Sequence, residues 1–240
     1  MHPLYHVDPG NPAFNPWTWY NLVGAGGCVF WLLAYLFILK KCFQDKSYGL
    51  PLVAICLNFG WELLASFVFP NPVALWHFFD RAWLAVDVLL AYQLLRWGPS
   101  QQRIPEIRRY FYWVVGVTFS VGLWGQYAFV SSYRDRLGLV GAFGVNLIMS
   151  VLFIFFYLDR RPLERGISKA GAVCKMLGTL GTSVECHFVV FSIDPEMQNL
   201  SFLTFLCVCI FLADCFYIFL VFSRPGAERV AVTGPARASG

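Results

Sequence analysis

The sequence predicts an all-α integral membrane protein built as a bundle of seven transmembrane helices. Three observations support this: 58% of the 240 residues are hydrophobic, 18% are aromatic and only 13% are charged, unlike a soluble globular domain. A helix needs about 20 apolar residues to cross a bilayer core. The stretches that reach this length are residues 19–39, 49–69, 76–95, 110–130, 137–158, 170–191 and 202–222.

The domain organisation is expected to be simple, with one membrane domain over residues 1–225. The connections are short, and the longest, residues 97–109, is predicted to be a loop, so no room remains for a soluble domain. Residues 1–18 contain four prolines and lack the basic start and short apolar core of a secretory signal. We expect them to cap the outer face, and we expect residues 226–240 to form a disordered tail.

The distribution of Lys and Arg predicts the orientation, because short cytoplasmic loops carry the excess of positive charge. One side has Lys40, Lys41, Lys46, Arg96, Arg103, Arg108, Arg109, Arg160, Arg161, Arg165, Lys169, Arg224, Arg229 and Arg237, and the other has Arg81, Arg134 and Arg136. The N-terminus is therefore expected outside and the C-terminus in the cytoplasm. Topology also explains the net charge of +4, so we do not expect nucleic-acid binding.

The first two stretches differ in their polar content. Residues 19–39 carry several glycines and no charge, which favours a role in helix packing. In the second stretch, Glu62 is the only charged residue. A carboxylate in hydrocarbon costs about 2.5 kcal/mol or more, so such a residue usually faces the protein interior and serves a function. Asn58, one turn earlier, shares its face and is expected to hydrogen-bond the Glu62 carboxyl or a substrate oxygen.

The third stretch contains two acids that we interpret differently. Asp80 is expected to belong to an interfacial polar cluster with His77 and Arg81. Asp87 is expected near mid-membrane, where an unpaired acid is expensive. The fourth and fifth stretches add Gln126 and Asn146, which either join helices or contribute to a site.

The last two stretches each place an acid in the membrane. Gly178, Gly181 and Glu185 lie on one stripe, so a neighbouring helix is expected to approach closely there, and Asp214 lies near the middle of the seventh stretch. Lys175 is expected to extend to the cytoplasmic surface. Without a basic partner, the acids Glu62, Asp87, Glu185 and Asp214 cannot all stay ionised in a low-dielectric interior. We therefore expect protonated carboxylic acids that act as proton donors.

Aromatic residues near these polar groups complete the candidate site. A protonated acid can start a reaction that passes through a carbocation, and a pocket lined by aromatic rings suits it. Such a pocket excludes water, and the ring faces stabilise the positive charge. The candidates are Trp61, Trp83, Trp124, Tyr127 and Tyr217. The sequence has no Cys-x-x-Cys pair and four histidines, so we expect free thiols, no metal and no cofactor.

The segment Asn-Phe-Gly-Trp-Glu at residues 58–62, with Asp214 in the last span, resembles the transmembrane terpene cyclases of fungal meroterpenoid and indole-diterpene pathways and their bacterial relatives. The resemblance implies that Glu62 and Asp214 are the acids of a metal-independent cyclisation of a prenylated aromatic or indole substrate. Epoxide opening is favoured over alkene protonation, because it needs a weaker acid and the chain lacks Asp-x-Asp-Asp. We expect a bacterial cytoplasmic membrane in preference to the fungal endoplasmic reticulum.

Other functions remain open. A proton-coupled small-molecule transporter also needs buried acids, although no internal repeat is evident in this sequence. A membrane protein that only binds a hydrophobic ligand is a further alternative. The expected partners are the bilayer and a hydrophobic prenylated small molecule, while the oligomeric state stays open.

Overall fold

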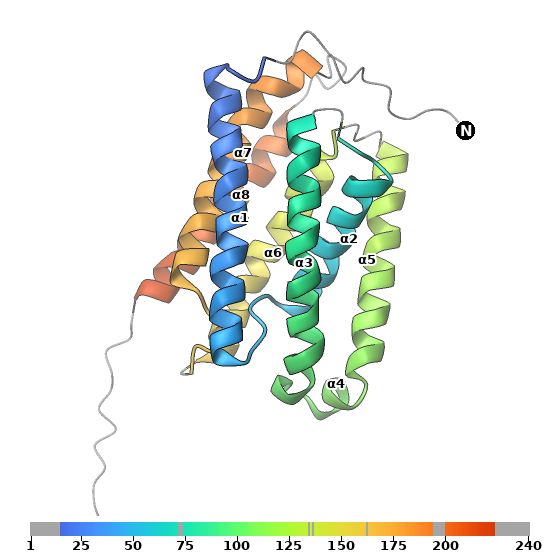
Figure 1. The fold of residues 1–240 in the computed structure, drawn as a ribbon, viewed down its shortest axis with the longest axis vertical. Coiled ribbons are helices and arrows are strands. Elements are labelled where there is room, and N and C mark those ends of the chain that lie inside the picture. Colours follow the sequence, from blue (N-terminus) through green and yellow to red (C-terminus); the bar gives the residue numbers. More distant parts are fainter. Residues whose placement is uncertain are drawn as a thin grey trace, which may run out of the picture.

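The computed structural model describes residues 15–71, 74–133, 135, 137–161, 163–193 and 200–223. This part of the chain folds into helices without strands, which confirms the all-α prediction. The helices are α1 (Trp19–Asp45), α2 (Leu52–Phe67), α3 (Ala74–Gln101), α4 (Pro105–Arg109), α5 (Phe111–Tyr133), α6 (Leu139–Arg160), α7 (Lys169–Ile193) and α8 (Ser201–Phe222). α1 and α3 run nearly parallel to each other, and α7 and α8 are tilted against them (Figure 1).

Each predicted stretch coincides with one long helix, but the connection over residues 97–109 is not a loop. α3 continues to Gln101, and α4 follows within the same segment. Pro105 begins α4, where its fixed φ suits the first helical turn. Glu106 in the first turn and Arg108 in the last turn complement the helix dipole. The outer cap expected over residues 1–18 falls mostly outside the described residues, and the tail expected over 226–240 falls wholly outside them.

Four of the helices, α1, α5, α6 and α8, are long and apolar enough to cross a membrane. α2 is equally apolar but has 16 residues. α3 and α7 are longer, with 28 and 25 residues, but they contain buried polar groups such as Asp80, Asp87 and Glu185. These three acids therefore belong to the interior of the bundle.

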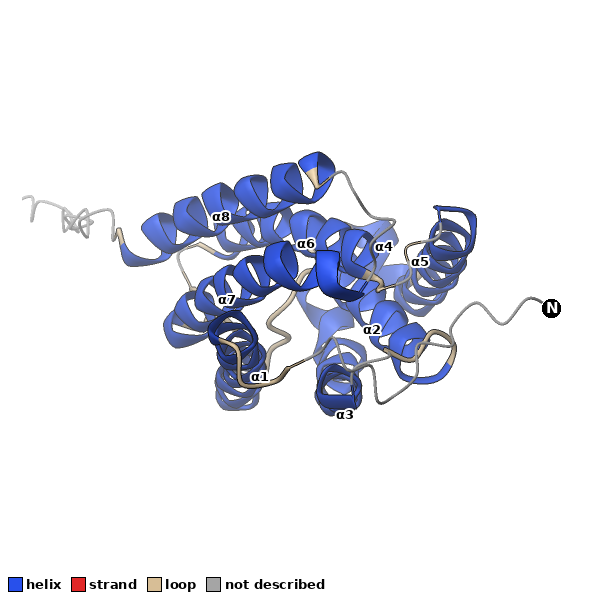
Figure 2. Cartoon of the chain, turned by 90° about the horizontal axis from the view of Figure 1, so that it is seen from above, coloured by secondary structure: helices blue, strands red, loops and turns tan. Residues whose placement is uncertain are grey.

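The position of α2 determines how the interior is organised. α2 contacts α3, α5 and α6, so it runs through the bundle, whereas α5 lies at one edge (Figure 2). Of the side chains on α5, those of Phe111 and Val130 are buried. A polar residue on α2 is consequently surrounded by protein, while most of α5 faces away from the core.

Glycines bring α1 and α7 into close contact, as expected from the stripe formed by Gly178 and Gly181. A Cβ atom added to Gly27 of α1 would lie 2.7 Å from the backbone nitrogen of Thr182 and 2.8 Å from the carbonyl oxygen of Gly178. The packing role predicted for the first span is thus confirmed at Gly27. Close backbone approach at small residues is the usual way in which membrane helices associate.

We expect Gly27→Ala to lower the thermal stability of the folded protein, because the new methyl group meets backbone atoms that have little freedom to move. Gly26→Ala is the matched control, since nothing lies within 4 Å of a Cβ atom at that position. Alanine in place of a helical glycine is favourable by about 0.5–1 kcal/mol. The measurement is the midpoint of thermal aggregation in detergent, and equal midpoints for the two variants would contradict the prediction.

Candidate active site

A pocket lies at the end of the bundle where α1 begins, and it reaches toward the middle. Its volume is about 1130 Å³ when the space at its mouth is included. Asn71, Asp135 and Gly138, in the connections that follow α2 and α5, line the outer part. Tyr35 of α1 and Met149 of α6 line the inner part. The pocket therefore joins the interior of the apolar bundle to one of its ends.

The connection before α6 is shaped to hold Trp61 in the pocket wall. The Asp135 carboxylate accepts hydrogen bonds from the backbone N–H of Val140, at 3.3 Å, and of Gly141, at 2.7 Å. Gly138 has a φ of +69°, and a Cβ atom there would lie 2.7 Å from the Trp61 ring. Glycine is thus required at residue 138 both for the backbone conformation and for the approach of the indole.

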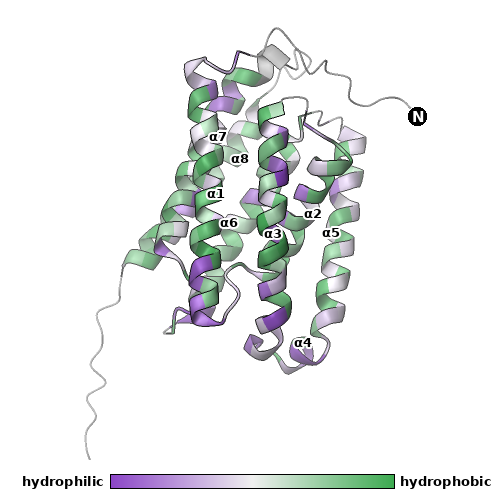
Figure 3. Ribbon diagram, in the orientation of Figure 1, coloured by the Kyte–Doolittle hydropathy of each residue, from purple (hydrophilic) through white to green (hydrophobic). Residues whose placement is uncertain are grey.

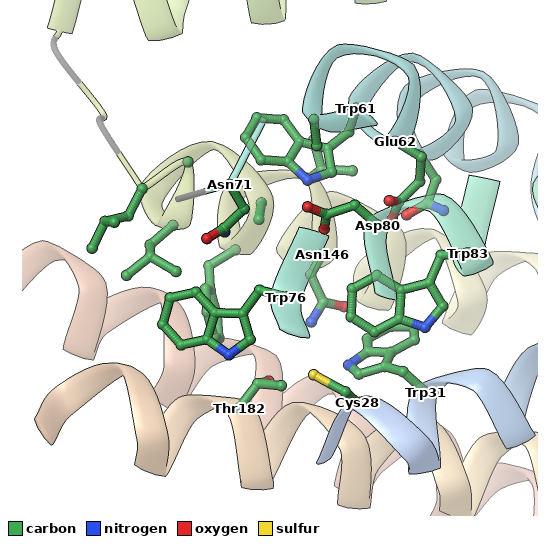
Figure 4. A pocket seen from close by; sticks show the side chains of 18 of the residues that line it. Cys28, Trp31, Trp61, Glu62, Asn71, Trp76, Asp80, Trp83, Asn146 and Thr182 are labelled. Carbon is green, nitrogen blue, oxygen red and sulfur yellow. The ribbon is translucent and has the colours of Figure 1, made fainter. Parts of the chain in front are cut away.

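Glu62 and Asp80 form the acidic part of the pocket wall. Both side chains are buried, and both line the pocket between Trp61 and Trp83 (Figure 4). Glu62 interacts electrostatically with Asp80 and with Asp87. Among the described residues, Glu62 Oε2 and Asp80 Oδ2 have no hydrogen-bond partner. Each acid consequently keeps, in the wall of the pocket, one buried oxygen without a hydrogen-bond partner from the part of the chain that the structure describes.

The expectation that Asp80 belongs to an interfacial polar cluster was wrong. Trp76, Asp80, Trp83 and Asp87 follow one another at helical spacing, so they share the face of α3 that turns inward. Arg81, the next residue along the chain, projects to the exposed outside of the helix. The sequence already indicated that Asp80 faces inward, because it lies seven residues, or two helical turns, before the buried Asp87.

Asn58 connects three helices below Glu62. Its amide nitrogen donates to Asp87 Oδ2 at 2.7 Å and to the hydroxyl oxygen of Tyr35 at 2.8 Å. The expected hydrogen bond from Asn58 to Glu62 is not formed, because both amide hydrogens are taken by α1 and α3. Asn58 and Asp87 thus stabilise the floor of the site, and the Glu62 carboxyl remains available to the pocket.

The wall formed by α6 and α7 carries two further residues expected from the sequence. Glu185 is buried, and its Oε1 accepts a hydrogen bond of 3.0 Å from Nε1 of Trp76. Asn146 donates from Nδ2 to the hydroxyl of Thr179 at 3.0 Å. Both residues line the pocket, so the structure brings Asn146 and Glu185 into the same site as Glu62.

Of the aromatic residues expected near the site, the structure places Trp61 and Trp83 in the pocket wall. Sequence reasoning missed Trp31, Tyr35 and Trp76, which also line the pocket. The indoles of Trp31, Trp61, Trp76 and Trp83 surround the buried acids (Figure 4). These residues were missed because an aromatic residue in a membrane helix is not by itself a signal of function.

The predicted site residues of α5 lie outside the pocket. Trp124 is 74% exposed, and Tyr127 stacks on Phe69 near the edge of the bundle. Gln126 donates from Nε2 to the carbonyl oxygen of Leu57 at 3.1 Å, which joins α5 to α2. Placing Trp124 and Tyr127 in the pocket was wrong, because α5 turns little of its surface inward. Gln126 makes the interhelical contact that was one of its two expected roles.

Asp214 also lies outside the pocket, where it forms a buried ion pair. Lys175 Nζ is 2.7 Å from Asp214 Oδ1 and 2.9 Å from Oδ2, and it donates to Ser150 Oγ at 2.6 Å. The expectation that Lys175 extends to the surface was wrong, because α7 and α8 pack together and bring the two charges to one level. Tyr217, one turn from Asp214, is buried against Phe153 and is likewise not in the pocket.

Among the residues that the structure describes, no group of three or more His, Cys, Asp or Glu side chains is arranged to hold a metal ion. All eight cysteines are free thiols.

Comparison with known proteins identifies the family. A family profile, that of the Pyr4-like transmembrane terpene cyclases, matches residues 9–224. The chain belongs to this family. The resemblance noted from residues 58–62 and Asp214 is thereby confirmed, and the membrane character expected from the apolar helices agrees with it.

Curated relatives of this Pyr4-like chain come from fungi. It is 30% identical to the terpene cyclase macJ of Penicillium terrestre over 173 residues, which cover 70% of this chain and 66% of the relative. It is 29% identical to the Pyr4-family terpene cyclase mfmH of Annulohypoxylon moriforme over 138 residues, or 56% of each chain. It is 23% identical to the asnovolin H synthase nvfL of Aspergillus novofumigatus over 196 residues, covering 78% of this chain and 80% of the relative.

The match to the first two of these relatives spans less than two thirds of their length. No solved structure matches this member of the family. The fungal origin of the relatives does not favour the bacterial cytoplasmic membrane expected from the sequence.

Proposed function

We propose that the protein is a membrane-embedded terpene cyclase in which the Glu62 carboxyl protonates a prenylated substrate. One observation supports this most directly: a buried carboxyl with an unpartnered oxygen lines a pocket walled by indole rings. Membership in the Pyr4-like family supports the reaction class. Desolvated carboxyl groups near other acids retain protons, which is the state that a general acid requires.

The proposed reaction is an isomerisation that needs neither a metal nor a redox cofactor. Glu62 transfers its proton to the oxygen of a terminal epoxide, or to a terminal alkene carbon, and leaves a carbocation. Internal alkenes of the prenyl chain attack the cation in turn, and each attack forms a carbon–carbon bond. Loss of a proton from carbon ends the sequence, so substrate and product have the same mass.

The indoles of the pocket serve the cationic stage of the proposed reaction. The negative faces of Trp31 and Trp83 attract a passing positive charge, and the enclosed wall limits access of water that would quench it. The substrate class that fits is a prenylated indole or other aromatic compound, and the epoxide is favoured over the alkene because its opening needs a weaker acid.

We expect Trp83→Ala to reduce cyclisation by about tenfold or more, since a desolvated cation–π contact contributes about 2 kcal/mol. Trp124→Ala is the matched control, because Trp124 lies on the outside of the bundle. Product formed per amount of folded protein is measured for both variants. Equal losses of product in the two variants would show that Trp83 does not stabilise the cation.

We also propose that the seven long helices all cross the membrane, with the N-terminus outside and the C-terminus in the cytoplasm. Described basic residues, among them Lys41, Arg103 and Arg160, gather at the end of the bundle opposite the pocket, where hydrophilic residues mark the lower ends of α1, α3 and α4 (Figure 3). The positive-inside rule assigns that end to the cytoplasm. The mouth of the pocket then faces the other side of the membrane.

The proposed function is tested with membranes that contain the protein and matched membranes that lack it. Each is incubated with a farnesylated indole or phenol, with and without a terminal epoxide, and the products are identified by mass and NMR. A cyclic isomer formed only with the protein supports the proposal. Recovery of unchanged substrate bound to the protein, or its movement across sealed vesicles, would favour ligand binding or transport instead.

A further inference from the structure

We propose that Glu185 is the base that removes the final proton, so that it determines the position of the double bond in the product. This inference rests on the proposed function, because it assigns the end of the reaction that Glu62 begins. The regenerated Glu62 carboxylate is the alternative base, and the two are distinguished by where they lie and by what they bind.

Glu185 and Glu62 belong to different walls of the pocket. α2, with Trp61 and Glu62, forms one side of the pocket, and α7, with Thr182, forms the side across from it (Figure 4). Glu185 lies one helical turn after Thr182 and also lines the pocket. The prenyl chain of a substrate held between these walls therefore meets Glu62 where cyclisation begins and Glu185 where the later rings form.

The two carboxyl groups also differ in their hydrogen bonds. Glu185 Oε1 accepts from the indole nitrogen of Trp76 at 3.0 Å, and an indole N–H is a donor only. Glu62 Oε2 has no hydrogen-bond partner among the described residues. Because the indole N–H can only donate, its hydrogen bond stabilises the charged carboxylate more than the neutral acid. Of the two buried acids, Glu185 is therefore better stabilised as a carboxylate, the form that receives a proton, and Glu62 is better held as the neutral acid that gives one.

The position of Glu185 is fixed by the contact between α1 and α7. A Cβ atom added to Gly24 would overlap the carboxyl group of Glu185. Lys175, the buried lysine of the same helix, is bound to Asp214 and is not the partner of Glu185. The Glu185 carboxyl is thus held between the backbone of α1 and the indole of Trp76, at one place in the pocket wall.

The step balances without a further reagent. The C–H bond next to the last cationic carbon breaks, its electron pair becomes the π bond of the new alkene, and the proton passes to the Glu185 carboxylate. Glu185 then returns this proton to water, and Glu62 takes one from water before the next turnover. The proton count is unchanged over the cycle, as an isomerisation requires.

The test compares Glu185→Gln with Glu62→Gln in the membrane assay, with substrate consumption and the ratio of product isomers recorded separately. We expect Glu62→Gln to consume no substrate. We expect Glu185→Gln to consume substrate but to lose the wild-type alkene by about 100-fold relative to other alkenes or a water-trapped alcohol, because a positioned base contributes about 10²–10⁴-fold. A loss of fold alone would lower all products together and leave their ratio unchanged.

Two further variants keep the inference testable if Glu185→Gln does not fold. Trp76→Phe removes the hydrogen bond to Glu185, and Gly24→Ala displaces its carboxyl group. Both are expected to shift the isomer ratio in the same direction as Glu185→Gln. An unchanged ratio in every folded variant, or a folded Glu185→Gln that consumes no substrate, overturns the inference. Cyclisation by Glu62→Gln would instead overturn the proposed function, whatever the isomer ratio.

Discussion

Replacing Glu62 by glutamine is expected to abolish cyclisation while the bundle stays folded. Glutamine has nearly the shape of glutamic acid but no acidic proton, and Glu62 is buried in the pocket wall. A general acid contributes about 10²–10⁴-fold to a reaction rate, so turnover is expected to fall at least about 100-fold. The stability is expected to hold, because a neutral amide avoids the cost of burying an acid among other acids.

The measurement is the amount of isomeric product per amount of folded protein, with folding followed by size-exclusion profile and thermal midpoint. Glu106→Gln in α4 is the control, since Glu106 is exposed and is not among the residues that line the pocket. It removes a carboxyl group of the same kind and is expected to leave turnover unchanged. A folded Glu62→Gln protein with the wild-type rate would show that another group starts the reaction.

The long helices were predictable from the sequence because hydrophobic length is a local property. α4 was missed because five residues with three charges carry no such signal. The acids of the site were predictable for the same local reason, since a charge within an apolar run is conspicuous wherever the chain folds. Glu62, Asp87 and Glu185 were identified in this way, and all three are buried.

The remaining features depend on contacts between helices, which the sequence does not express locally. Trp83 and Trp124 have similar polar neighbours in sequence, but α3 turns one inward and α5 turns the other outward. The ion pair between Lys175 and Asp214 depends on the register of α7 against α8. Lys175 lies near the start of α7 and Asp214 near the middle of α8. The two come to the same level only when the helices are packed together.

This ion pair predicts a second large effect, which concerns folding. Asp214→Asn leaves the Lys175 ammonium buried without a countercharge, and Lys175→Met leaves the Asp214 carboxylate in the same condition. Removal of one partner of a buried pair costs about 3–5 kcal/mol, which is a large part of the about 5–15 kcal/mol that stabilises a typical protein. Each single variant is expected to give much less folded protein than the wild type, as measured by fluorescence-detected size exclusion.

The double variant, Lys175→Met with Asp214→Asn, separates this structural part of Asp214 from the acid role that the family resemblance implies. Replacing both partners by neutral groups is often neutral for stability, so the folded yield is expected to recover. The cyclisation rate is expected to recover to within about tenfold of the wild-type rate, because Asp214 does not line the pocket. A tenfold difference in rate corresponds to about 1.4 kcal/mol. The residual loss reflects the contacts of Lys175 with Ser150 and with the Trp31 ring at the pocket wall. A double variant that folds as the wild type does but forms no product would show instead that Asp214 supplies a proton to the reaction.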